Sequence, residues 1–445
     1  MKRYAKYKDS GVEWIGDIPE GWASTKLKSI GHFYGGLVGK TGEDFRSEDY
    51  STMKPFIKFT NISNNLYVPL NDFGYVVINE NDKQNLVRQY DLFFLMSSET
   101  KEDVGKCSCL KNEVGELYLN TFCKGYRIYD NSVSPLFLNY LLSGKIYRDI
   151  LSNEGNGFTR INLRLDRVNN LQIFLPPLIE QEQIVSYLDE KTSYIDKLLA
   201  ISKRKIGLLK EQRSSIINQV VTKGLNPNAK MKHSGVEWIG DIPEGWGVLP
   251  LKYLVKENSN SLSNSTDPNY KLKYIEISDI NSNGTISNTT DYIFSNCPSR
   301  CRRILKKGDV AISTVRTYLK SIFIIENEVI DLICSTGFSV LSPNKNVNSK
   351  HLFYMVRSEW FISSIISKSE GVSYPSIQSD KLMNTFVLNI PPIEQEQIVA
   401  YLNEKINIID KSISIEERRI GLLKEYRQSI ISQVVTGKIK VTADE

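Results

Sequence analysis

The sequence predicts an α+β protein of two similar units, each with a β-rich domain followed by one long helix. Three observations support this class. A long helical pattern at 180–222 returns at 394–436. A short segment with two tryptophans stands near the start of each half, at 11–22 and 235–246. Between segment and helix, each half carries short runs of β-branched and aromatic residues, which are typical of strands.

The long helices give the strongest pattern. EQEQIVSYLDEK at 180–191 returns as EQEQIVAYLNEK at 394–405, with 10 of 12 positions identical. IGLLKEQRSSIINQVVT at 206–222 returns as IGLLKEYRQSIISQVVT at 420–436, with 14 of 17 identical. A double proline precedes each repeat, and glutamates place negative charge at the positive end of the helix dipole. Each repeat is expected to form one helix of about forty residues, roughly 60 Å long.

One face of each predicted helix is apolar at all eight equivalent positions, at steps of three, four and seven residues. This spacing is typical of a coiled-coil seam, and the nearest partner for each helix is its own repeat. Gly207 and Gly421 occupy the same place in both helices, at a cost of about 1 kcal/mol each. We interpret them as a close helix–helix crossing, although simple duplication would leave the same pattern. The expected packing residues are Ile184, Leu188, Ile195, Leu199, Ile206, Gly207, Leu209, Ile216, Val220, Ile398, Leu402, Ile409, Ile413, Ile420, Gly421, Leu423, Ile430 and Val434.

The GVEWIGDIPEGW segment is identical in both halves at 12 of 12 positions. We expect a short irregular segment whose tryptophans, Trp14 and Trp22 or Trp238 and Trp246, anchor the chain on a neighbouring surface. The two copies of this segment are 224 residues apart, whereas the two helix copies are 214 residues apart. The stretch between segment and helix is therefore ten residues longer in the first half than in the second. The polar stretch 223–234 is expected to be a flexible linker. The predicted segments are a first domain at 1–175, a helix at 176–224, a second domain at 225–390 and a helix at 391–445.

Between these landmarks the two halves share a pattern but few identical residues. One helix is expected late in each domain, at 135–151 and at 349–367, followed by a polar loop and a last strand. The predicted strands are 55–60, 75–78, 91–96, 117–119, 126–129 and 171–175 in the first half and 272–277, 309–313, 321–325, 338–341 and 385–390 in the second.

Composition limits the classes of protein that the chain can belong to. Its 445 residues are 41% hydrophobic and 24% charged, with no apolar run of about eighteen residues that would span a membrane. The first residues lack the apolar stretch of a signal peptide, so we expect a cytoplasmic protein. Six cysteines and three histidines show no zinc-ligand spacing, which favours free thiols. The net charge of +5 permits a nucleic-acid partner without requiring one.

Two near-identical helices that carry two unlike domains indicate a protein that recognises two different features at a fixed spacing. A DNA duplex with two recognition segments separated by uncontacted base pairs fits this layout, because the major groove distinguishes every base pair. The alternative from another class is a coiled-coil scaffold with two β-rich protein-binding domains. A footprinting experiment separates them, since a scaffold protects no split DNA site.

The repeated GVEWIGDIPEGW segments and the helix beginnings IFLPPLIEQEQIV and LNIPPIEQEQIV make the chain similar to the specificity subunit of type I restriction-modification enzymes. The resemblance covers essentially the whole chain. It implies two target-recognition domains, each recognising one half of a bipartite DNA site. It also implies two long antiparallel coiled-coil helices and a pseudo-two-fold internal repeat.

The same resemblance implies which chemistry lies elsewhere. Two modification subunits would bring S-adenosylmethionine and adenine methylation, and restriction subunits would bring ATP-driven translocation and Mg²⁺-dependent cleavage. No catalytic residue, metal or cofactor is then expected in this chain.

The motifs of the chain agree with a non-catalytic role. There is no GxxxxGK[ST] phosphate-binding loop and no Asn-Pro-Pro-aromatic motif of the kind that amino-methyltransferases carry. Asp91, Glu99 and Lys101 could hold Mg²⁺ beside a phosphate, but the equivalent stretch after Asp309 lacks the glutamate. A self-sufficient nuclease is therefore a second alternative, tested by assaying the purified chain with Mg²⁺ alone.

Two loops in each half recur by position and combine hydroxyl, amide and basic side chains. The first loop lies at 97–106 and 313–320, and the second precedes the last strand at 155–164 and 371–379. Arginine pairs with guanine and asparagine or glutamine with adenine, whereas serine and lysine contact phosphates. We expect base contacts from Arg160, Asn162, Arg316 and Gln378, and phosphate contacts from Ser97, Lys101, Lys106, Lys320 and Ser376.

Overall fold

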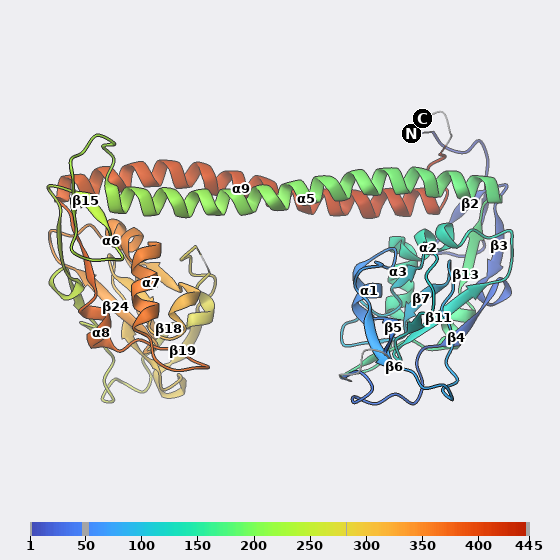
Figure 1. Cartoon of the computed structure of the whole chain (residues 1–445), viewed down its shortest axis with the longest axis horizontal. Coiled ribbons are helices and arrows are strands. Elements are labelled where there is room, and N and C mark those ends of the chain that lie inside the picture. Colours follow the sequence, from blue (N-terminus) through green and yellow to red (C-terminus); the bar gives the residue numbers. More distant parts are fainter. Residues whose placement is uncertain (1, 47–52, 282, 442–445) are drawn as a thin grey trace. The chain divides into compact units, whose positions relative to one another are not determined.

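The computed structural model describes residues 2–46, 53–281 and 283–441 (Figure 1). The chain forms two compact units, one made of the residues up to Ser202 together with those from Arg418, the other of Lys203–Glu417. Helices α5 (Leu178–Lys223) and α9 (Pro392–Val435) each contribute one part to either unit. Each unit also contains one globular domain of strands and short helices, which we call head 1 (before α5) and head 2 (between α5 and α9). The predicted α+β class with an internal repeat is confirmed.

Head 1 is built on a four-stranded antiparallel sheet with the order β4-β11-β7-β9. A three-stranded sheet has the order β10-β5-β6, in which β5 pairs in parallel with β10 and antiparallel with β6. The bounds are β4 (Gly31–Gly35), β5 (Met53–Ile57), β6 (Gly74–Val77), β7 (Leu92–Leu95), β9 (Cys107–Cys109), β10 (Tyr118–Leu119) and β11 (Cys123–Ile128).

Head 2 has the same topology although its sequence differs. Its first sheet is antiparallel with the order β17-β24-β21-β22, and its second has the order β19-β18-β23-β20. In the second sheet β18 again has one parallel and one antiparallel neighbour, and β20 is an additional strand. The bounds are β17 (Val255–Glu257), β18 (Lys271–Ile275), β19 (Thr290–Ile293), β20 (Cys301–Ile304), β21 (Val310–Ser313), β22 (Ile322–Ile324), β23 (Leu332–Ser335) and β24 (Phe338–Pro343).

The last strand of each head pairs with the strand that follows the repeated segment, which brings that segment next to the start of a long helix. These pairs are β13 (Gln172–Leu175) with β3 (Ala23–Lys26) and β25 (Phe386–Asn389) with β16 (Gly247–Pro250). We had expected the repeated segment to be irregular and the linker at 223–234 to be flexible. Both expectations are partly wrong, because each stretch contains a short strand. The peptide groups of both find partners in two short hairpins, β1 (Tyr7–Asp9) with β2 (Asp17–Pro19) and β14 (Met231–His233) with β15 (Asp241–Pro243).

The prediction of one helix late in each head is wrong, because each predicted range contains two helices. In head 1 the break is at Gly144, whose φ of −61° and ψ of 144° are extended. In head 2 it follows Arg357, where Ser358 has φ −63° and ψ 150°. The apolar pattern is helical on both sides of each break, so periodicity alone does not reveal one extended residue. The helices are α2 (Pro135–Ser143), α3 (Lys145–Asn153), α6 (Ser349–Val356) and α7 (Glu359–Ser367).

Each of the eleven predicted strand runs overlaps a strand, but 55–60 and 272–277 extend beyond theirs into helical turns. No helix in the described parts of the chain is both long and apolar enough to cross a membrane. The remaining elements are α1 (Phe59–Asn64), α4 (Leu165–Asn169), α8 (Ser379–Met383), β8 (Ser97–Ser98), β12 (Ile161–Asn162) and the 3-10 helices η1 (Leu27–Ser29), η2 (Leu251–Tyr253), η3 (Ile277–Asp279), η4 (Phe294–Asn296) and η5 (Thr317–Leu319).

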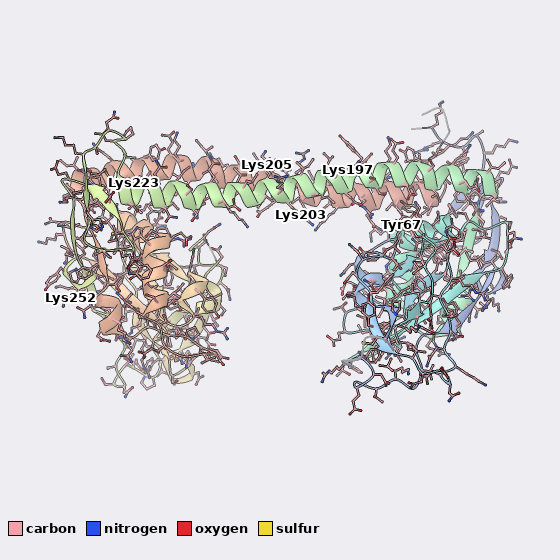
Figure 2. The ribbon with its side chains drawn as sticks, in the orientation of Figure 1. Tyr67, Lys197, Lys203, Lys205, Lys223 and Lys252 are labelled. Carbon is pink, nitrogen blue, oxygen red and sulfur yellow. The ribbon has the colours of Figure 1, made fainter. Side chains whose placement is uncertain are left out.

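Within each unit the parts of α5 and α9 run antiparallel, as predicted. In the second unit, Lys205 Nζ lies 2.7 Å from Glu416 Oε1 (Figure 2 labels Lys205 on α5). Further along α5, Arg213 Nε lies 3.2 Å from Asp410 Oδ1. Higher residue numbers on α5 therefore pair with lower residue numbers on α9, as in an antiparallel pair. The first unit has the equivalent ion pair, with Arg427 Nε 3.2 Å from Asp196 Oδ1.

The predicted seam is most fully buried where the helices meet the heads. In the first unit Ile184, Leu188, Ile430 and Val434 share one core with Trp22 and α2. In the second unit Val220, Ile398 and Leu402 share the core of Trp246. The seam residues therefore also fasten each head to its helices. Ile195, Ile409 and Ile413 are buried outside these cores, and half-buried positions are Leu199, Ile206, Leu209, Ile216, Ile420 and Leu423.

The close crossing expected at Gly207 and Gly421 is not found. Both glycines are exposed, and a Cβ atom added to either would have no atom within 4 Å. The shared glycine thus marks common descent of the two helices and not a packing requirement, which was the alternative that the sequence left open.

Candidate nucleic-acid interface

The repeated helix beginning anchors the repeated segment through one hydrogen bond in each unit. Trp22 is buried and its Nε1 donates to Glu180 Oε1 at 3.3 Å. Trp246 is equally buried and donates to Glu394 Oε2 at 2.8 Å. The other tryptophan of the segment is not an anchor of this kind, since Trp14 and Trp238 are 38% and 49% exposed. In head 1 the first tryptophan still packs on a neighbouring surface, because the Trp14 ring meets the buried Tyr147 ring edge-on with 5.5 Å between ring centres. The hydrogen-bonded anchor of the segment is its second tryptophan.

The glutamine that follows this glutamate fixes the first helix of each head. Gln181 accepts from the backbone N–H of Ser134, the residue before α2, at 2.8 Å and donates to two carbonyls. Gln395 does the same for Asn348, the residue before α6, also at 2.8 Å. Sequence analysis missed this role, although the identical EQEQ letters in both copies were its signal.

A third contact joins each head to its helix. In head 1, Tyr67 (Figure 2) and Tyr140 donate to Asp189 Oδ1 at 2.8 and 2.7 Å, and Lys111 donates to Asp189 Oδ2 at 2.7 Å. Burial acts to raise the pKa of Asp189, but these three donors outweigh it and lower the pKa. In head 2, the Tyr354 hydroxyl donates to Asn403 Oδ1 at 3.0 Å. The bond from Tyr140 to Asp189 is therefore equivalent to the bond from Tyr354 to Asn403, and each head is held on its helix at the same position.

The two predicted loops of each head meet. In head 1, β8 pairs with β12, so Ser97 lies opposite Asn162. In head 2, Val315 forms the equivalent bridge with Ser376. The Ile377 N–H also donates to the Thr314 carbonyl at 2.9 Å. The structure thus brings together the loop residues that the sequence placed some sixty positions apart, once in each unit.

The second loop of each head is a tight turn closed by main-chain bridges, Asn156 to Asn162 and Glu370 to Ser376. We call residues 157–161 tip loop 1 and residues 371–375 tip loop 2. Each begins with a glycine of positive φ, 145° at Gly157 and 107° at Gly371, which other residues rarely adopt. A Cβ on Gly157 would lie 1.9 Å from the Arg160 carbonyl oxygen. The glycine therefore fixes the shape of the turn.

The two arginines predicted to contact bases both lie over aromatic rings. The Arg160 guanidinium is 4.6 Å from the ring centre of Phe122, and that of Arg316 is 4.4 Å from the ring centre of Tyr374. Stacking of this kind holds a guanidinium plane in one orientation. Tyr374 occupies in tip loop 2 the position that Arg160 occupies in tip loop 1, so the tip loop supplies the cation of the stack in head 1 and the ring in head 2.

Arg316 has two further unusual features. Its φ of 51° lies in the left-handed region, and its backbone N–H donates to the Pro375 carbonyl at 2.7 Å. Its Nε atom is buried and has no hydrogen-bond partner among the described residues. A left-handed arginine costs about 1 kcal/mol or more and persists where the surroundings require it, often at functional sites.

Two of the predicted phosphate-binding lysines are already paired. Lys106 Nζ donates to Asp103 Oδ1 at 2.6 Å and to the Ser63 carbonyl at 2.9 Å. Lys320 Nζ donates to Glu359 Oε1 at 2.6 Å. Lys101 is exposed, and so is Gln378 at the start of α8. A phosphate would have to displace a carboxylate at Lys106 and Lys320 but not at Lys101.

The nuclease-like set of residues is not assembled. Asp91 is 2% exposed and is held by Arg127, whose Nε and Nη2 lie 2.9 and 2.6 Å from its two oxygens. The equivalent Asp309 accepts from the Ser342 hydroxyl at 2.7 Å, and burial raises its pKa. Within residues 2–46, 53–281 and 283–441, no group of three or more histidine, cysteine or acidic side chains could hold a metal. Asp91 and Asp309 therefore serve the fold of the heads.

Comparison with known families agrees with this geometry. A family model described as "Type I restriction modification DNA specificity domain" matches the chain twice, at residues 19–210 and 243–424. The type I restriction enzyme MjaVIII specificity subunit of Methanocaldococcus jannaschii is 22% identical, over 95% of this chain and 94% of its own length. The StySPI specificity subunit of Salmonella potsdam is also 22% identical, over 95% and 90%.

Solved structures share the fold. A chain from a study titled "Structural basis underlying complex assembly and conformational transition of the type I R-M system" matches with a TM-score of 0.69 at 18% identity. The match covers 95% of this chain and 99% of that one. The HsdS subunit from Thermoanaerobacter tengcongensis matches with a TM-score of 0.52 at 17% identity, over 95% and 98%.

Proposed function

Because the chain belongs to the family of type I restriction-modification DNA specificity proteins, we propose that each head recognises one half of a bipartite double-stranded DNA site. The family assigns the chain two DNA-recognition domains and a non-catalytic role. The two loops of each head form the surface that contacts DNA, and their different side chains give the two heads different base preferences.

One observation carries the proposal. Both heads present the same pair of loops in the same register, Ser97 opposite Asn162 and Val315 opposite Ser376, but with different side chains. The two heads share a backbone arrangement but present different hydrogen-bond donors and acceptors. This suits two domains that both bind duplex DNA but recognise different base sequences. The contrast between Arg160 in tip loop 1 and Tyr374 in tip loop 2 is the clearest case.

The nine candidate residues then divide by geometry. Arg160 and Arg316, with planes fixed by aromatic rings, suit guanine O6 and N7, and Asn162 and Gln378 suit adenine. Ser97, Lys101 and Ser376 would position the backbone. Lys106 and Lys320 would do so by exchanging Asp103 and Glu359 for phosphate.

The partners follow from family membership at the level of DNA and a restriction-modification complex. We propose two modification subunits, one docked on each unit, with restriction subunits joining them in the cytoplasm. S-adenosylmethionine, ATP and Mg²⁺ would be bound by those partners. Support comes from exposed apolar side chains seven residues apart on both helices. Tyr194 and Ile201 on α5 are 63% and 58% exposed, and Ile408 and Ile415 on α9 are 54% and 66% exposed.

The test of DNA recognition uses the full chain and a library of randomised duplexes. Wild-type protein should select two short sequences separated by a spacer of constant length. Arg316→Ala should cost about 1–3 kcal/mol and relax the sequence of one half only, and Arg160→Ala should relax the other.

The control is Arg302→Ala. The Arg302 guanidinium is also stacked on an aromatic ring, 4.9 Å from the ring centre of Phe294, but Arg302 lies outside both loops of head 2. It should leave both halves unchanged. If Arg316→Ala also leaves both halves unchanged, Arg316 does not contact bases. Selection of no split site at all would favour the protein–protein scaffold.

A further inference from the structure

Two apolar side chains stand fully exposed at equivalent positions of the two heads. Phe158 in tip loop 1 and Val372 in tip loop 2 have exposed fractions of 107% and 101%, and the next large apolar residue in the described chain, Ile330, has 83%. An isolated exposed apolar residue is ordinary. Here both tip loops begin with a glycine, this apolar residue and a hydroxyl residue (Thr159 or Ser373), whereas the next position differs in chemistry, Arg160 against Tyr374.

The tips are held in place. The bridges that close the loops have N–H···O distances of 2.9–3.0 Å in head 1 and 2.9 Å in both directions in head 2. The glycines of positive φ before Phe158 and Val372 set the direction in which each tip projects. A side chain presented on a closed turn loses little conformational freedom on binding, which favours a contact role.

Hydrogen-bond donors flank both tips. Arg160 follows Phe158 by two residues, and Arg316 is stacked on Tyr374, two residues after Val372. The edge of an A·T base pair in the major groove offers acceptors together with one apolar group, the 5-methyl group of thymine, which G·C pairs lack. An apolar tip two residues from a fixed guanidinium in head 1, or from the ring on which one is stacked in head 2, matches that combination.

We infer that Phe158 and Val372 contact thymine 5-methyl groups, one in each half of the DNA site, and so add a preference for thymine that the arginines cannot supply. This inference rests on the proposed function. It makes the tip residue a specificity-determining residue in each head.

The experiment removes the methyl group instead of the base pair. Once the split site is known, each half in turn is synthesised with deoxyuridine in place of thymine, which keeps every hydrogen-bonding atom. Binding of the wild-type chain should weaken roughly fourfold for each contacted methyl group, the effect of withdrawing one buried carbon from an apolar contact.

Variants assign the contact. Phe158→Ala should abolish the uracil effect in one half and keep it in the other, and Val372→Ala should do the reverse. Ile330→Ala, an exposed apolar residue of head 2 outside the tip loops, should keep both effects. Thermal unfolding of each variant checks that the fold is retained, and substitution of an exposed tip is expected not to change it.

Three results would overturn the inference while leaving DNA recognition standing. These are a wild-type chain that does not distinguish uracil from thymine, variants that keep the wild-type distinction in both halves, or half-sites without thymine. A tip that instead wedges between base pairs would weaken binding on truncation equally for thymine and uracil. A wild-type chain that selects no split site would remove the proposed function itself.

Discussion

At the scale of single residues, the repeat places different side chains in equivalent surroundings. His351 in α6 stands where Phe137 stands in α2, and both are buried. Burial lowers the pKa of His351 to about 4, and its Nε2 atom has no hydrogen-bond partner among the described residues. A neutral imidazole therefore fills in head 2 a place that a phenyl ring fills in head 1.

His351→Phe should make head 2 less sensitive to acid. Because the pKa of His351 is lower in the folded chain than its usual 6.5, its contribution to stability is complete above about pH 6.5. That contribution falls as the pH drops towards 4, by up to about 3 kcal/mol. The midpoint of thermal unfolding between pH 7 and pH 4 should fall less steeply in the variant. Phe137→His is the reciprocal control and should steepen the fall, and an unchanged slope in His351→Phe would refute the assignment.

Residue chemistry in the loops could be predicted from the sequence, but residue partners could not. Arg160 and Arg316 were expected from the basic and amide composition of their loops. Their stacking on Phe122 and Tyr374 depends on two loops that meet only after the sheets have formed. Lys106 and Lys320 were predicted to contact phosphate, and the structure pairs them with Asp103 in the same loop and with Glu359 of α7. Only the second pair depends on contacts between distant segments.

At the scale of elements, long periodic patterns were predictable and short interruptions were not. Helices α5 and α9 follow from apolar positions that repeat over forty residues. The breaks at Gly144 and Ser358 involve one extended residue each and leave the apolar pattern unchanged. Gly207 and Gly421 show the opposite error, because a residue that suggested a tertiary contact lies in open space.

Gly207→Ala and Gly421→Ala should each stabilise the protein by about 1 kcal/mol. Alanine has the higher helix propensity, and neither glycine has a positive φ or a neighbour that a methyl group would meet. Denaturant unfolding followed by circular dichroism measures the change. Gly144→Ala is the matched control and should not stabilise, since its Cβ would lie 3.1 Å from the Leu141 carbonyl oxygen. If Gly207→Ala destabilised the protein, the interpretation of Gly207 as a close helix–helix crossing would be supported after all.

At the scale of the whole molecule, duplication was predictable because 12 identical residues open each half and the helices recur nearly unchanged. The common topology of the heads was only suggested, because strand partners depend on packing between distant segments. The parallel pairs β5–β10 and β18–β23 show that both heads share one fold. The same duplication gives each unit its own exposed pair of apolar side chains on a long helix.

This arrangement predicts how many modification subunits each variant binds. Wild-type chain should bind two, Ile201→Glu or Ile415→Glu one, and the double variant none, because a carboxylate in an apolar contact costs more than the contact contributes. Native mass spectrometry of the mixed subunits counts them. Lys203→Glu, a charge change at an exposed position of α5 (Figure 2), is the control and should still bind two. Two bound subunits on the double variant would exclude this surface.

The bonds from Trp22 and Gln181, and from Trp246 and Gln395, have an evolutionary consequence. All four residues lie in the segments that the two halves keep in common. Mutations between those segments leave these four bonds in place, provided that the sheets still form, whereas the bonds from Tyr140 to Asp189 and from Tyr354 to Asn403 require particular residues of the heads. New target preferences can therefore arise by drift or recombination in one half, while the rest of the enzyme continues to assemble on an unaltered framework.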